Sequence, residues 1–177
     1  IQGNTIRDNR DEGIHIGTGA DRNEIRGNIF RKNKRENIYV LSAHGNIIVE
    51  NTSTEANNTA IFIKHSNNTY VANNTTADSP IQLRGNSVGN TLVNNHLNGS
   101  GYFFEGYEDP PGVWTYPHDN QVTGGSVTGA SVCLRFSGAY NNRVDQLQIS
   151  NCGAPVVMGS LGGQAPTGNV ISTIPPQ

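Results

Sequence analysis

The chain has 177 residues, of which 34% are hydrophobic and 15% are charged, and its formal net charge is −2. This length suits one domain with a single core, and the 21 glycines argue against a helical bundle. Evenly spread Ile, Val and Leu exclude a disordered tail, the charge excludes the basic surface of a nucleic-acid-binding protein, and no apolar run reaches the roughly 20 residues of a membrane span.

A repeat with a period close to 22 residues runs through the chain and predicts its fold. The first segment of each repeat is a short strand of the form Asn-x-apolar, and Ile1 belongs to a truncated first copy. The complete copies begin at Asn23, Asn46, Asn68, Asn90, Asn120, Asn142 and Asn169. Longer steps between copies are expected to be insertions in turns.

The second segment of each repeat follows a recurrent asparagine, at Asn4, Asn28, Asn51, Asn73 and Asn95. Its strand positions are Ile6, Phe30, Ser53, Thr75, Leu97, Val127 and Ile149. Because asparagine tolerates the left-handed backbone region and stacked amides can hydrogen-bond to one another, these residues predict a tight corner with an amide ladder.

The third segment is the most regular, since apolar residues alternate in it with a period of two. It recurs at 14–16, 38–40, 61–63, 81–83, 102–104, 132–134 and 156–158. One face of this strand is therefore expected to be buried and the other exposed. Three strands per coil and about seven coils predict an all-β protein, a single-stranded parallel β-helix.

The sequence resembles the right-handed parallel β-helix superfamily, in the NosD-like group of copper-site-maturation and carbohydrate-enzyme repeats. The resemblance lies in Gly13-Ile14-His15-Ile16, Asn23-Glu24-Ile25 and Asn28, and the repeat covers essentially the whole chain. It implies a right-handed solenoid but little about activity, because the superfamily includes polysaccharide lyases, hydrolases, epimerases, phage spikes and binding modules.

We expect residues 1–177 to form one β-helix domain, with residues 106–119 as an inserted loop beside the exposed face. Because the chain begins with Ile1 inside a coil and neither end has a capping helix, the pattern indicates a fragment of a longer chain or a homo-oligomer.

Substrate lies along the exposed face of the third strand in enzymes of this superfamily, as the resemblance implies. We expect one outward column to contain His15, Tyr39, Phe62, Gln82, Phe103, Cys133 and Val157. The next column is expected to contain Gly17, Leu41, Lys64, Arg84, Glu105, Arg135 and Gly159. In the fifth coil the alignment leaves open whether Glu105 or a residue next to it occupies this column.

Three of the four basic residues after position 50, Lys64, Arg84 and Arg135, share the second column. Such a row of cations matches an anionic chain, and Tyr39, Phe62 and Phe103 would offer flat surfaces to sugar rings. Substrate-binding residues are therefore predicted at Tyr39, Phe62, Gln82, Phe103 and Arg135, with Trp114 and His118 from the loop. In the alternative interpretation the cations and aromatic rings only shield the sheet, and the loop is a covering flap.

Cleavage of a uronate chain by β-elimination needs a base, a cation beside the carboxylate and an acid. Lys64, Arg84 and His65 are the catalytic candidates, and the first two are similar to the Lys/Arg pair of chondroitinase B-like and alginate lyase β-helices. Those enzymes recruit calcium with several acidic or amide groups, whereas only Glu105 and Asn86 stand on the matching face here. The sequence therefore leaves open whether calcium is a cofactor and whether the protein is an enzyme.

The favoured interpretation is an extracellular or cell-envelope module that binds an acidic polysaccharide, as part of a lyase or a uronate epimerase. The alternative is a structural or adhesion module such as a phage spike segment. No metal site is predicted, because the histidines lack cysteine or carboxylate partners at ligand spacing. Cys133 and Cys152 are expected to be two small apolar residues, and a disulfide between them is the alternative that the sequence leaves open.

Overall fold

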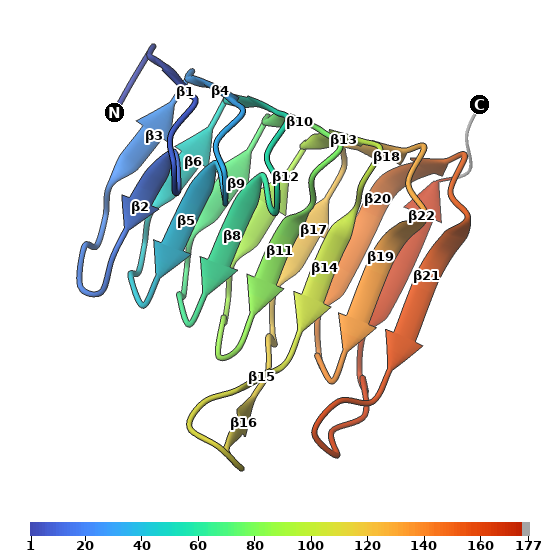
Figure 1. Cartoon of the computed structure of the whole chain (residues 1–177). Helices are drawn as coiled ribbons and strands as arrows, with labels where there is room; N and C mark the ends of the chain where they lie inside the picture. Colours follow the sequence, from blue (N-terminus) through green and yellow to red (C-terminus); the bar gives the residue numbers. More distant parts are fainter. Residues whose placement is uncertain (175–177) are drawn as a thin grey trace.

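The computed structural model describes residues 1–174, which form 22 β-strands and no helices (Figure 1). The strands stack in coils, and each coil pairs in parallel with the next, as in a β-solenoid. The predicted all-β parallel β-helix of about seven coils is therefore confirmed.

Each coil contributes a strand to three parallel rows. The first row consists of β3 (Glu24–Arg26), β6 (Ile47–Val49), β9 (Tyr70–Ala72), β12 (Thr91–Val93), β17 (Gln121–Thr123), β20 (Arg143–Ser150) and β22 (Val170–Ile174). The second row consists of β1 (Thr5–Arg7), β4 (Ile29–Arg31), β7 (Thr52–Thr54), β10 (Thr75–Ala77), β13 (His96–Asn98) and β18 (Ser126–Thr128). The long strand β20 pairs with both β17 and β18, so it joins the two rows into one 13-stranded sheet.

The third row is a separate seven-stranded sheet, and it contains the strands of Lys64 and Arg84. It consists of β2 (Ile14–Ile16), β5 (Ile38–Leu41), β8 (Ile61–Lys64), β11 (Ile81–Arg84), β14 (Tyr102–Glu105), β19 (Val132–Ser137) and β21 (Ala154–Gly159). The inserted loop carries a small antiparallel hairpin, β15 (Tyr107–Glu108) and β16 (Trp114–Thr115), which protrudes beyond the ends of these strands (Figure 1).

The inward positions of the three rows fill the solenoid with one apolar column. Ile38, Ile63, Leu92 and Phe104 are fully buried in it, and the ring of Phe104 stacks on that of Phe136 with 4.9 Å between centroids. Alternation of apolar and polar residues with a period of two puts these side chains on one side of each short strand. The side chains on the other face of the third row, such as Gln82 and Arg84, are only partly buried.

Buried asparagines form ladders at two corners of the coil, of which the repeat predicted the first. In the first, Asn28, Asn51 and Asn74 each donate to the Oδ1 atom of the asparagine one coil further on, over 2.9–3.1 Å. Asn90, Asn120 and Asn142 do the same at the second corner. Each ladder satisfies buried backbone N–H groups that would otherwise have no partner.

The predicted alignment of the fourth copy was wrong by one residue. Thr69 and Asn74, rather than Asn68 and Asn73, align with the ladder positions of the neighbouring coils, and Thr76 rather than Thr75 aligns with Ser53. Asn68 and Asn73 have φ angles of 56° and 55°, so they form left-handed turns just before those positions. Thr69 therefore interrupts the second ladder.

The predicted alignment of β19 was wrong by two residues. Leu134 pairs with Tyr102 and Arg135 pairs with Phe103, so Cys133 does not belong to the outward column. Cys133 is fully buried at the inward corner, where the backbone of Gly101 approaches it so closely that a Cβ atom on Gly101 would lie 2.1 Å from the carbonyl oxygen of Cys133.

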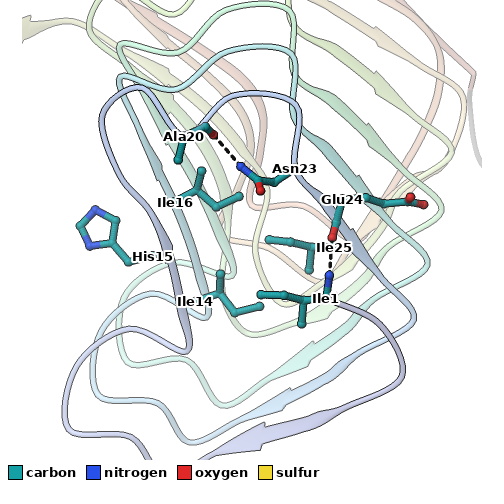
Figure 2. Close-up of a pocket in the computed structure, with 8 residues that line it drawn as sticks. All are labelled: Ile1, Ile14, His15, Ile16, Ala20, Asn23, Glu24 and Ile25. Atoms are coloured by element: carbon teal, nitrogen blue, oxygen red, sulfur yellow. Dashed lines mark hydrogen bonds between the residues drawn. The ribbon is translucent and has the colours of Figure 1, made fainter.

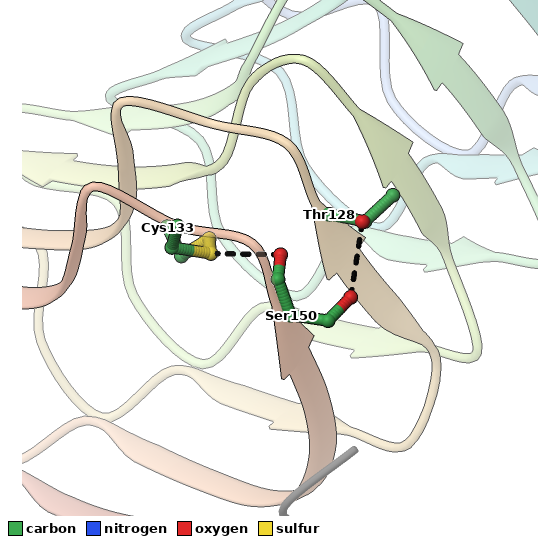
Figure 3. Close-up of a disulfide and its surroundings, with 4 residues drawn as sticks. Thr128, Cys133 and Ser150 are labelled. Atoms are coloured by element: carbon green, nitrogen blue, oxygen red, sulfur yellow. Dashed lines mark hydrogen bonds between the residues drawn. A yellow bond between two sulfur atoms is a disulfide. The ribbon is translucent and has the colours of Figure 1, made fainter. Parts of the chain in front are cut away.

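Cys133 and Cys152 form a disulfide, which corrects the expectation of two unlinked residues (Figure 3). Their Cα atoms are 6.0 Å apart, and their separation of 19 residues is close to one coil. The bond therefore links β19 to the turn between β20 and β21 of the next coil. Beside it, Ser150 donates to the hydroxyl oxygen of Thr128 at 3.0 Å.

Candidate functional site

The outer face of the third row contains all three cations that the sequence singled out. Lys64 and Arg84 are neighbours in register on β8 and β11, as expected. Arg135 lies instead in the adjacent column, beside Phe103, because of the shifted alignment of β19. The predicted single column of three cations was therefore wrong, although all three residues belong to one sheet.

Lys64 and Arg84 share one neighbour, the ring of Tyr107. The ammonium nitrogen of Lys64 lies 3.5 Å from the ring centroid, and the guanidinium carbon of Arg84 lies 4.8 Å from it. Within residues 1–174 neither cation forms an ion pair with a carboxylate. The ion pairs next to them on this face join His65 to Asp109 and Arg135 to Glu105. The result is a pair of adjacent positive charges that contact an aromatic ring.

The charged N-terminal coils differ from this pair. Arg26 contacts Glu24 and Glu50, and Arg31 contacts Glu55, at 2.6–2.8 Å. These ion pairs already neutralise their cations, whereas Lys64 and Arg84 retain unneutralised charge that an anion can bind.

His65 lies beside the pair, in a turn with a φ of 50°. Its Nδ1 atom accepts a hydrogen bond from the backbone N–H of Asn86 at 3.1 Å, so the neutral ring carries its proton on Nε2. The Nε2 atom is buried, without a hydrogen-bond partner among the described residues, and lies 3.8 Å from Oδ2 of Asp109. Burial and the charge of Lys64 lower the pKa of His65, and Asp109 opposes them. His65 is thus arranged to donate a hydrogen bond, and its lone pair is not free to act as a base.

Glu105 closes the site on the side of Arg84. It is in register with Arg84, but its carboxylate accepts a hydrogen bond from Gln82 Nε2 at 2.6 Å and lies 3.4 Å from Nη1 of Arg135. The guanidinium of Arg135 also lies 4.6 Å from the centroid of Phe103. Gln82, Phe103 and Arg135 are therefore joined into one network through Glu105.

The aromatic column does not offer open ring faces. Tyr39 stacks on Phe62 with 5.1 Å between centroids, and His15 lies 4.8 Å from Tyr39. Only 9% of Tyr39 and 8% of Phe62 is exposed. The expectation of flat surfaces for sugar rings was wrong, because each ring already covers its neighbour. Binding of substrate by Tyr39 and Phe62 stays a prediction.

The inserted loop approaches the cations through only part of its length. Trp114 stacks on Tyr116 and packs against Gly162, and the hydroxyl of Tyr116 donates to the carbonyl oxygen of Gly162 at 3.0 Å. These two rings anchor the hairpin to the loop after β21. His118 stacks on Tyr140 and bonds to Asp119 at a corner of the coil.

Tyr107 is the residue of this site that sequence reasoning missed. It stands two residues after Glu105, at the start of the insertion, and the sequence offers that position as its only signal. The contacts with Lys64 and Arg84 depend on the direction in which the hairpin leaves β14, and a repeat pattern does not encode that direction.

A cavity of about 220 Å³ opens at the N-terminal end of the solenoid, and it is distinct from this site (Figure 2). Ile1, Ile14, Ile16 and Ile25 line it, while the ring of His15 points away from it. Asn23 and Glu24 also line it, but their hydrogen bonds in Figure 2 are made within the chain, from Asn23 to the carbonyl oxygen of Ala20 and from the terminal amine of Ile1 to the carbonyl oxygen of Glu24.

Side chains that could bind a metal are dispersed in the part of the chain that the structure describes. Among residues 1–174, His, Cys, Asp and Glu side chains do not gather in groups of three or more that could hold a metal ion. That part of the chain also contains no helix with the length and hydrophobicity to cross a membrane.

Comparisons with known proteins concern mainly the fold. A family model described as periplasmic copper-binding protein (NosD) matches residues 1–106, which is more than half of the chain. The solved structure of the periplasmic alginate epimerase AlgG aligns with 92% of this chain at 16% sequence identity and a TM-score of 0.39. The chain spans 47% of the length of that epimerase. No curated protein matches the chain significantly.

The copper named in that family description does not fit the described residues. Both cysteines are joined in the disulfide, so neither supplies a thiolate, and Met158 is the one methionine of the chain. With no cluster of three other ligands in residues 1–174, no step of a mechanism is assigned to copper.

Proposed function

The chain belongs to the family of periplasmic copper-binding proteins (NosD), and from this premise we propose that it is a periplasmic β-helix module that binds an acidic polysaccharide. The binding surface is the outer face of the third row, centred on Lys64 and Arg84. The disulfide between Cys133 and Cys152 supports a location outside the cytoplasm, because disulfides persist in oxidising compartments.

One observation carries this proposal: two adjacent cations on an exposed wall form no ion pair within residues 1–174 and contact the ring of Tyr107 instead. Charge without a partner attracts an anion. Lysine supplies a compact charge, and arginine can donate two parallel hydrogen bonds to a carboxylate.

Binding is tested by the melting temperature in the presence of alginate, pectate or chondroitin. A ligand that binds only the folded state raises this temperature in proportion to the logarithm of its concentration. We expect the double substitution Lys64→Ala with Arg84→Ala to remove the rise. Arg7→Ala with Arg31→Ala removes the same charge from the second row and is the matched control.

A rise that persists in the Lys64→Ala, Arg84→Ala protein would place binding elsewhere on the molecule. The absence of a rise with every polyanion would favour a structural module and contradict the proposal. High salt should weaken the interaction, since the contacts are between exposed charges.

Catalysis is a separate part of the proposal. Arg84 would neutralise a uronate carboxylate, and Lys64 in its neutral amine form would take the proton from C5. In β-elimination the C4–O bond would then break and the ammonium of Lys64 would return the proton to the leaving oxygen, whereas in epimerisation C5 would regain a proton on its opposite face. His65 would then act as a hydrogen-bond donor, since its Nδ1 atom is occupied by the amide of Asn86. Lyase action is tested by the ultraviolet absorbance of the unsaturated product, and epimerisation by exchange of solvent deuterium into the polymer. Neither signal is expected from the Lys64→Ala protein.

A further inference from the structure

We propose that the ring of Tyr107 closes a binding site for a single oxyanion group, and that a ligand displaces this ring when it binds. The inference rests on the proposed function, because it concerns the same cation pair. It specifies the group that binds, which is one carboxylate or sulfate substituent of a glycan. It also assigns a closed state to the site, in which the ring of Tyr107 occupies the place of that group.

Three hydrogen-bond donors surround the Tyr107 ring. Its centroid lies 3.5 Å from Nζ of Lys64, 4.8 Å from Cζ of Arg84 and 5.8 Å from the centroid of the His65 ring. The His65 ring meets it edge-on, at an interplanar angle of 73°. The ring therefore fills a space that is bounded by two cations and an imidazole N–H group.

Two of these donors are buried but have no hydrogen-bond acceptor among residues 1–174. They are Nε of Arg84 and Nε2 of His65. Buried donors without partners are uncommon in folded proteins, because their lost hydration is not replaced. An aromatic face attracts cations, but it accepts hydrogen bonds far more weakly than an oxyanion does. A carboxylate or sulfate in the place of the ring would satisfy these donors.

The hairpin also supplies a carboxylate to the same place. Oδ2 of Asp109 lies 3.8 Å from Nε2 of His65. The insertion thus covers the donors with both a ring and an acidic group of its own. Tyr107 pairs with Thr115, which lies between the anchoring rings of Trp114 and Tyr116, so the backbone of Tyr107 is held in place. The ring would therefore leave the site by rotation of its side chain.

The neighbouring coil limits the site to one anionic group. Glu105 stands next in register to Arg84, and its charge is turned towards Gln82 and Arg135. A second acidic group of a ligand at that coil would face this carboxylate. The closed site therefore suits one oxyanion substituent better than an unbroken row of them.

Binding constants of five proteins test the inference. They are measured by calorimetry and followed by the fluorescence of Trp114, the single tryptophan of the chain. Alginate oligosaccharides supply carboxylates alone, and dextran sulfate supplies sulfates alone. We expect Tyr107→Ala to bind one of them about tenfold more tightly than the unaltered protein, which corresponds to about 1.4 kcal/mol. Tyr107→Phe keeps the ring and should bind within about twofold of the unaltered protein. Tyr70→Ala, which removes an exposed tyrosine from β9, should have no effect.

The outcomes separate closure from the proposed function. Tighter binding by Tyr107→Ala that disappears when Lys64→Ala is added supports closure over the cation pair. Equal or weaker binding by a Tyr107→Ala protein that melts like the unaltered one overturns closure, whereas binding by the unaltered protein would keep the proposed function intact. If none of the proteins binds either polymer, the proposed function fails as well.

Discussion

Arg135 Nη1 lies 3.4 Å from Oε1 of Glu105, on the neighbouring strand of the exposed sheet. The same carboxylate accepts a hydrogen bond from Gln82. A negative charge therefore stands within the surface proposed to bind a polyanion, and it is the one carboxylate of β14.

Replacement of this carboxylate should strengthen binding. Glu105→Gln keeps the shape of the side chain, removes its charge and leaves Arg135 without its partner. We expect polyanion affinity to rise about threefold, which corresponds to about 0.7 kcal/mol, while stability changes by about 1 kcal/mol or less. Glu50→Gln alters an ion pair with Arg26 on another row and should leave affinity unchanged. Unchanged affinity in Glu105→Gln would show that the ligand does not reach this coil.

His65 predicts a loss of stability in acid. Burial and Lys64 lower its pKa in the folded state, so the unfolded state binds a proton more readily. The stabilising contribution of the neutral ring is present above about pH 6.5, the ordinary histidine value, and is lost as pH falls through the lower folded pKa. Urea unfolding at pH 7.5 and at lower pH should therefore show a falling free energy of unfolding.

The substitution His65→Asn should flatten this pH dependence. Asparagine tolerates the left-handed backbone at position 65 and offers an acceptor to the amide of Asn86. His96→Asn removes an exposed histidine from β13 and serves as the control. An equal change of slope in both variants would contradict the assignment to His65.

The amide ladder makes Asn74 a strong determinant of stability. Its Oδ1 atom accepts from both the backbone N–H and the Nδ2 of Asn51, and its own Nδ2 donates to Ile48 and Asn95. Asn74→Ala leaves these buried groups unpaired, so we expect a loss of about 3 kcal/mol in the free energy of unfolding. Asn73→Gly, at the adjacent exposed left-handed position, should cost much less. Equal losses in denaturant unfolding would mean that the ladder bonds are not what stabilises this corner.

The disulfide should stabilise the C-terminal coils without affecting the site. Cys133 is fully buried and belongs to the hydrophobic core, whereas Arg135 is partly exposed on the outer face. Reduction should lower the free energy of unfolding by about 3 kcal/mol, as expected for a closed loop of this size. Cys133→Ala with Cys152→Ala should be insensitive to reductant. Polyanion affinity that falls on reduction would contradict the separation of the disulfide from the binding wall.

The repeat was readable because every coil places similar residues at equivalent positions. The alternation around Ile38, Ile61 and Ile81 predicted the exposed wall and the pairing of Lys64 with Arg84. Errors arose where a corner gained a residue. Asn68 has the right identity for the ladder, but the chain turns at this residue and Thr69 occupies the position instead.

The site was predictable only in part. Lys64, Arg84 and His65 are together, as expected from their coil positions. The covered faces of Tyr39 and Phe62 were not foreseen, because rings on successive coils stack on one another at the spacing of the strands. Trp114 was expected in the groove, yet it packs against Gly162, almost fifty residues further along the chain.

The amino-acid pattern alone determined the solenoid, its number of coils and the wall on which the cations stand, because strand alternation and coil period are local properties repeated along the chain. Only the tertiary structure decided that Tyr107 lies over Lys64 and Arg84 and that Arg135 lies beside Phe103. Both relationships depend on the register between coils and on the packing of an insertion against a distant loop, and no single repeat contains that information.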